Sequence, residues 1–80
     1  NSNITMSIYP NPVNNKLTIQ FLKGYIEKEI YLSNILGEEI FYAKSDQDSL
    51  DIETQNFLQG IYFLRIKTEK GDFVTKIIKE

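Results

Sequence analysis

Hydrophobic and polar residues alternate with a period of two along most of this chain. The clearest runs are residues 17–21 and residues 61–68. In the second run Tyr62, Leu64 and Ile66 share one face. Such alternation is typical of β-strands that bury one face, whereas an amphipathic helix needs apolar residues at i, i+3, i+4 and i+7. No window of the chain sustains the helical spacing, so the pattern predicts an all-β domain.

The alternating runs predict about seven short strands at a spacing of about ten residues. They are expected at residues 4–8, 17–21, 29–33, 39–43, 50–53, 61–68 and 73–79. Short, evenly spaced strands joined by polar turns are typical of an antiparallel sandwich or barrel. We favour a sandwich of two small sheets. The inward face of the fourth strand is ambiguous, because Ile40, Phe41 and Tyr42 are all large.

The connections between these strands carry turn residues. Two prolines in Tyr9–Pro12 end the first strand, because each removes a backbone donor from the ladder. Gly37 can take the positive φ that its turn needs. Further connections are expected at residues 14–15, 23–24, 45–49, 55–59 and 70–71. The segment 55–59 is expected to be irregular, with at most one helical turn, and to be anchored by Phe57 and Leu58.

Length and composition restrict the function classes. The chain has 80 residues, which we expect to form one domain, with residues 1–3 as a linker remnant. Nine basic and eleven acidic residues argue against nucleic-acid binding. The absence of cysteine and histidine excludes disulfides, thiol nucleophiles and a histidine-based triad. The chain begins at Asn1, so we expect a piece of a longer protein whose export signal could lie upstream.

Several motifs occur together in a distinctive order. They are Tyr9–Pro12 before the strand at Leu17–Ile19, then Leu36–Ile40, then Phe57–Ile66, and finally Val74–Lys79. In this order and spacing the chain resembles the C-terminal sorting domain of the type IX (Por) secretion system of Bacteroidota. The resemblance extends from about residue 4 to residue 79. Glu80, an acid after the basic last strand, departs from the pattern.

The resemblance implies an immunoglobulin-like antiparallel β-sandwich and a secretion signal without catalytic residues, metal or cofactor. The domain would follow an N-terminal cargo domain and be recognised by the outer-membrane translocon. A sortase-like peptidase would then remove it, leaving the cargo on the cell surface or released. The protein would pass through the periplasm on this route. The motif residues that the resemblance marks, which we expect to be structural, are Tyr9, Pro10, Asn11, Pro12, Gly37, Gly60, Ile61 and Tyr62.

The last strand is the candidate recognition element. Its residues are Phe73, Val74, Thr75, Lys76, Ile77, Ile78 and Lys79. A terminal strand lies at a sheet edge or closes a sheet, and an exposed edge can accept a partner strand by β-augmentation. The alternative is a solvated edge whose lysines, Lys76 and Lys79, oppose aggregation. An unpaired edge also makes a dimer of two copies possible.

Two motifs have a structural and a functional interpretation. Tyr9–Pro12 is either a rigid exposed bend that docks a partner or a crossing between sheets with Tyr9 packed as a lid. Gly60 is expected to adopt a conformation that a side chain forbids. Tyr62 is expected in the core, with its hydroxyl bonded to a buried partner.

Other features leave alternatives open. Acidic residues in the stretch 46–53 could be read as a calcium site, but a solvated strand face explains them better. Asp48–Leu50 resembles a short O-glycosylation motif of the same bacterial group. Tyr25, Tyr31 and Phe63 are the best candidates for exposed aromatics, which keeps an adhesive or carbohydrate-binding sandwich as the alternative function. An enzyme would need a pair of carboxylates in a cleft, and no such pair is evident.

Overall fold

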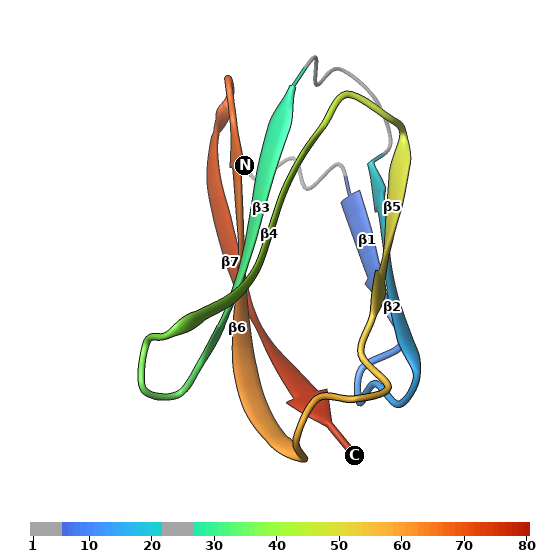
Figure 1. The fold of residues 1–80 in the computed structure, drawn as a ribbon. Coiled ribbons are helices and arrows are strands. Elements are labelled where there is room, and N and C mark those ends of the chain that lie inside the picture. Colours follow the sequence, from blue (N-terminus) through green and yellow to red (C-terminus); the bar gives the residue numbers. More distant parts are fainter. Residues whose placement is uncertain (1–5, 22–26) are drawn as a thin grey trace.

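The chain folds into two antiparallel sheets that face each other, as seen in the computed structural model (Figure 1), which describes residues 6–21 and 27–80. One sheet has the strand order β1-β2-β5, formed by Met6–Tyr9, Lys16–Phe21 and Ser49–Glu53. The other has the order β4-β3-β6-β7, formed by Glu39–Ser45, Lys28–Asn34, Gly60–Thr68 and Gly71–Lys79. The expected immunoglobulin-like β-sandwich is therefore confirmed. No helix in these ranges is long and apolar enough to cross a membrane.

Three expectations about the course of the chain fall outside the described residues. They are the linker at residues 1–3, the start of the first strand at Ile4 and the connection at residues 23–24.

The core consists of the inward side chains of both sheets. In β2, the alternating residues Leu17, Ile19 and Phe21 are all buried, as their pattern predicts. The other buried apolar residues are Met6, Val13, Ile30, Leu32, Ile52, Tyr62, Leu64, Ile66 and Ile77. Because one face of each sheet is dry and the other is wet, a period of two is the pattern that such strands require.

The facing of β4 is resolved by its pairing with β3. Phe41 lies opposite the buried Leu32 and packs against the core, while Ile40 and Tyr42 on either side are 38% and 45% exposed. The three large side chains therefore alternate between the two faces. The register shifts between Leu32 and Ser33, which leaves Ile40 without a partner on β3.

The segment between β5 and β6 is a turn and not a helix. The N–H of Phe57 donates to the carbonyl of Thr54 at 3.0 Å, and the Phe57 ring packs against the core. Leu58 is 83% exposed, so the expectation that it anchors this segment is wrong. The turn brings only one of the two neighbouring apolar side chains to face inward.

Lys28, at the start of β3, is buried without being apolar. It is 1% exposed, and its ammonium group donates to the carbonyl of Gln47 at 2.5 Å. The same group lies 4.6 Å from the centre of the Phe21 ring. A hydrogen bond and an aromatic face together replace part of the water that the charge has lost.

Candidate recognition edge and the segment that covers it

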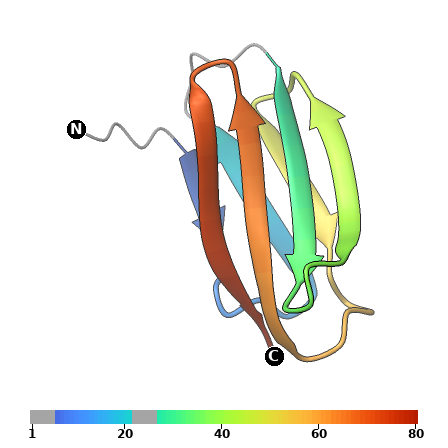
Figure 2. The ribbon, with the colours of Figure 1, turned by 90° about the vertical axis from the view of Figure 1, so that its left-hand side faces the viewer.

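Strand β7 lies at the edge of the four-stranded sheet, with β6 as its neighbour (Figure 2). The expectation that the terminal strand lies at an edge or closes a sheet is confirmed as an edge. The pairing with β6 runs from Thr68 opposite Gly71 to Gly60 opposite Lys79. In an antiparallel pair, successive residues direct their backbone groups alternately toward and away from the neighbour. Every second residue of β7 therefore offers its N–H and C=O at the open edge.

The side chains of β7 divide between the core and the outer face of the sheet. Ile77 is buried, whereas Val74 and Ile78 are 59% and 38% exposed and Lys76 lies exposed between them. On β6, Ile61 and Phe63 are also exposed and pair with Ile78 and Lys76 respectively. The edge is thus flanked by a small apolar surface that carries a single lysine of β7.

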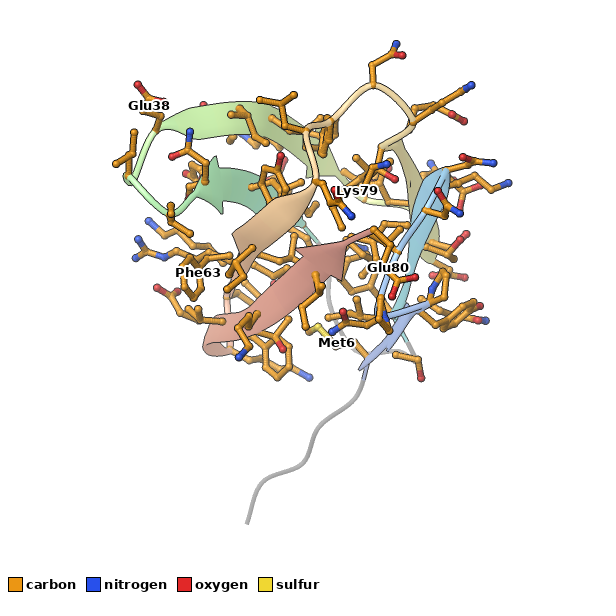
Figure 3. The ribbon with its side chains drawn as sticks, turned by 90° about the horizontal axis from the view of Figure 1, so that it is seen from below. Met6, Glu38, Phe63, Lys79 and Glu80 are labelled. Atoms are coloured by element: carbon orange, nitrogen blue, oxygen red, sulfur yellow. The ribbon has the colours of Figure 1, made fainter. Side chains whose placement is uncertain are left out.

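Lys79 does not belong to this exposed face. It is only 7% exposed, so the expectation that it acts as a solvated edge lysine is wrong. Alternation along β7 turns its side chain toward the inside of the sandwich, and its ammonium group reaches the Glu80 carbonyl at 3.2 Å. Figure 3 shows Lys79 and Glu80 together at the end of β7, apart from Phe63 on the outer side.

The Tyr9–Pro12 motif lies beside the C-terminal half of β7. It does not carry the chain from one sheet to the other, because β1 and β2 on either side of it are neighbours in the same sheet. The loop between them reaches across to β7 and returns. Tyr9 is 45% exposed and its hydroxyl donates to Gln20, so the expectation of a packed lid is wrong. The peptide bonds before Pro10 and Pro12 are both cis.

Asn11 binds β7 through its side-chain amide. Its Nδ2 donates to the carbonyl of Lys76 at 2.9 Å, and its Oδ1 accepts the N–H of Ile78 at 3.0 Å. One amide side chain therefore satisfies two backbone groups of the strand edge. This role was not predicted, because an asparagine between two prolines is equally typical of any turn.

Val13 continues the same contact with its backbone. The N–H of Val13 donates to the carbonyl of Ile78 at 2.7 Å, and the Val13 carbonyl accepts the N–H of Glu80 at 2.9 Å. Val13 and Lys79 form an isolated parallel bridge, and the Val13 side chain is 1% exposed. A lone valine in an otherwise polar loop was the signal in the sequence that this loop must pack against something.

The Gly60–Tyr62 motif joins the start of β6 to the preceding turn. Gly60 has φ +147°, a value that side chains disfavour. Tyr62 is 7% exposed, and its hydroxyl donates to the carbonyl of Leu58 at 2.5 Å. Beside it lies an open hollow of about 360 Å³ whose lining includes Ile35, Ile40, Leu58 and Ile61.

The Leu36–Ile40 motif begins in the turn between β3 and β4. Gly37 has φ +86°, so the expected positive φ is confirmed. The Asn34 Oδ1 accepts the N–H groups of Leu36 and Glu38 at 2.9 and 3.0 Å. This side chain holds the turn closed, which leaves Leu36 79% exposed.

The acidity of Tyr31 is clearly perturbed. Its hydroxyl donates to the Glu29 carboxylate at 2.6 Å, which raises the pKa of the Tyr31 phenol to about 12. Removing that proton would place two negative charges side by side. The ring also contacts Tyr42, with 5.0 Å between ring centres.

The remaining candidates do not assemble into a site. Among residues 6–21 and 27–80, no group of three or more acidic side chains is arranged to hold a metal ion. Asp51 instead accepts a hydrogen bond from Thr18 and lies 3.7 Å from the Lys16 ammonium group. Ser49 of the O-glycosylation motif is exposed at the start of β5. Tyr25, one of the expected exposed aromatics, lies outside the described residues.

Comparison with known families agrees with the fold and with the order of the motifs. No curated protein matches the chain. The family described as the secretion system C-terminal sorting domain matches residues 7–80, which is nearly the whole chain. That span includes β1 from its second residue, the loop that covers β7, and the strands β2 to β7. The chain therefore belongs to the family of secretion system C-terminal sorting domains.

Proposed function

We propose that this domain directs its cargo to the outer-membrane translocon by presenting strand β7 to it. Membership of the family, over residues 7–80, is the observation that carries the function. As a C-terminal sorting signal of type IX secretion, the chain follows an N-terminal cargo and interacts with the secretion machinery. The protein is accordingly exported to the cell surface or the extracellular space.

Three properties of β7 support it as the element that the translocon engages. It is an edge strand, its outward face carries the exposed apolar residues Val74 and Ile78, and Lys76 supplies a positive charge between them. An edge with unpaired backbone groups gives affinity through main-chain hydrogen bonds, while the alternate side chains give specificity. The recognition element therefore comprises Phe73–Lys79, with Phe73, Thr75 and Ile77 fixing the strand against the core.

We propose the finer steps of the route on the basis of the same family membership. The 80-residue chain acts as one non-catalytic sorting domain, and it crosses the periplasm folded behind its cargo. A sortase-like peptidase then cleaves upstream of β1 and attaches or releases the cargo. The family match lends no support to the alternative of a carbohydrate-binding module.

The same edge suits a dimer in the isolated domain. If β7 pairs in antiparallel fashion with β7 of a second copy about Val74, Asp72 lies opposite Lys76 of that copy. The opposite charges would then pair twice across the two-fold axis, on either side of a valine pair. Sedimentation at increasing protein concentration would detect this association, and a monomer at millimolar concentration would contradict it.

Photocrosslinking tests the engagement of β7. The chain is fused behind a periplasmically exported fluorescent reporter in a bacterium with a type IX system. A photoreactive residue replaces Lys76 on β7 or, as the matched control, Lys44 on the opposite edge strand β4; the control position is similarly exposed. We expect a crosslink to an outer-membrane component from position 76 and none from position 44. Continued export without a crosslink at position 76 would contradict the assignment of β7.

A further inference from the structure

We propose that the segment Asn11–Val13 is an intramolecular clip that closes the C-terminal half of the β7 edge, so that a partner strand docks only at Asp72–Lys76. The inference rests on the proposed function of β7 and names the part of the strand that serves it. It also assigns to Asn11, in the family motif, a role that turn chemistry alone does not predict.

The clip imitates an added parallel strand. A residue of a parallel strand donates its N–H to one residue of the neighbour and accepts an N–H from the residue two positions later. The Asn11 side chain does this around Ile77, because its amide bonds Lys76 and Ile78 at 2.9 and 3.0 Å. Val13 repeats the pattern around Lys79 with its own backbone, at 2.7 and 2.9 Å. Two successive steps of a parallel ladder are thus already occupied from within the chain.

The covered stretch is also anchored, so that a partner strand must displace more than one side chain to enter it. Val13 is 1% exposed, and the neighbouring carbonyl of Asn14 accepts the Thr54 hydroxyl at 3.1 Å. The N–H of Thr54 in turn donates to the carbonyl of Asn15 at 2.9 Å. These bonds tie the loop to the segment after β5, so the clip is held at its C-terminal end.

The N-terminal half of the β7 edge, which the clip does not cover, is open among the described residues. The alternation that directs the backbone groups of Lys76 and Ile78 toward the open edge, away from β6, does the same for those of Asp72 and Val74. No described residue outside the sheet forms a backbone hydrogen bond with Asp72 or Val74. Within residues 6–21 and 27–80, the backbone groups left without a partner are therefore those of these two residues and the N–H of Lys76, enough for a partner strand of three or four residues.

The side chains along this open stretch define the partner. Val74 is 59% exposed and lies opposite Arg65, while Lys76, opposite Phe63, has no carboxylate partner among the described residues. Asp72 lies 2.9 Å from Arg65 in an exposed ion pair, so Lys76 is the charge on this stretch that lacks a neighbour of opposite sign among the described residues. We therefore commit to one occupant, an extended segment of the secretion machinery that places an apolar side chain over Val74 and a carboxylate against Lys76.

Amide hydrogen exchange of the 80-residue chain tests the clip. Asn11→Ala removes both side-chain bonds to β7, whereas Asn14→Ala, in the same loop, removes none that reaches β7. We expect the Ile78 amide to exchange roughly tenfold faster in Asn11→Ala, for two lost hydrogen bonds, and to be unchanged in Asn14→Ala. The Ile77 amide, which faces β6, serves as the internal reference. Equal Ile78 exchange in all three proteins would overturn the clip.

Export of the reporter fusion tests the docking edge. Val74→Pro deletes an N–H that faces away from β6, and Val74→Ala trims the side chain but keeps that N–H. We expect export to fall at least tenfold in Val74→Pro and to persist in Val74→Ala and Asn11→Ala. Lys76→Glu, which leaves the backbone intact, is expected to lower export as well and covers the case in which the proline variant does not fold.

The outcomes separate this inference from the proposed function. If the unaltered fusion is not exported by the translocon, the sorting role itself fails. If it is exported, and folded Val74→Pro and Lys76→Glu are exported equally well, the machinery does not dock at Asp72–Lys76. A Val74→Pro protein that loses only self-association would show that the edge serves a second copy instead. Loss of export in folded Asn11→Ala would show that the clip itself is recognised, and would also overturn the proposal.

Discussion

Replacing Tyr62 with phenylalanine removes one hydroxyl and keeps the ring in the core. Tyr62 is 7% exposed and its part-buried hydroxyl donates to the carbonyl of Leu58 at 2.5 Å, while the ring centre lies 5.5 Å from that of Phe57. A hydrogen bond contributes about 0.5–1.5 kcal/mol net, and more when its loss leaves a partner unsatisfied. Since Leu58 is exposed, water can reach its carbonyl in the variant. We therefore expect a loss of about 1–1.5 kcal/mol in the free energy of unfolding.

For a domain of this size, about 1 kcal/mol corresponds to a shift of roughly 4–8 °C in Tm. Thermal and urea unfolding, followed by circular dichroism, would measure the change. Tyr9→Phe is the matched control, because that hydroxyl donates to Gln20 at 3.0 Å from a side chain that is 45% exposed. Its loss is expected to be below about 0.5 kcal/mol, as for most surface changes. Equal stability of the two variants would refute the reasoning that the Tyr62 hydroxyl ties the turn to β6.

Three further predictions concern other parts of the domain. Lys28→Ala should lower the free energy of unfolding by about 2–5 kcal/mol, as for other large buried side chains, and Lys28→Met should lower it by less. Urea unfolding measures both changes, and a Lys28→Ala variant as stable as the unaltered chain would contradict this prediction. Gly37→Ala should destabilise by about 1–2 kcal/mol, because φ is +86° there, whereas Gly37→Asn should be milder in the same assay. The pKa of Tyr31 is raised from 10.0 to about 12, chiefly by its hydrogen bond to Glu29. The contribution of this bond to the free energy of unfolding is therefore complete below pH 10 and is lost as the pH rises toward 12. In a titration of tyrosine absorbance, Glu29→Gln should return this late ionisation toward pH 10, and an unchanged curve would contradict the role of Glu29.

The sandwich could be predicted because each strand has one dry face and one wet face. This alternation alone was enough to place Leu17, Ile19 and Phe21 in the core. Where large residues follow one another, the sequence was less informative. The facing of β4 depended on its register against β3, in which Phe41 lies opposite Leu32, and a register is set by the pairing of two strands rather than by either strand alone.

The candidate site was predicted in part. The sequence left two positions open for β7, at an edge or closing a sheet, and it did not indicate the cover over half of that edge. Asn11 and Lys76 are far apart in the sequence, so their bond depends on how the two sheets pack. The same packing turned Lys79 inward, which an expectation based on charge alone could not include. Leu58 failed as an anchor for a similar reason, because the direction of a side chain in a turn follows no period.

The most direct test of the sorting role is the export of a reporter by this chain. Residues 1–80 are fused behind a fluorescent reporter that reaches the periplasm, and the reporter is quantified at the cell surface and in the medium. The measurement is made in a bacterium with a type IX system and in the same strain without the translocon. The account predicts reporter outside the cell only when the translocon is present. A reporter that stays periplasmic in both strains, on a domain shown to be folded, would contradict it.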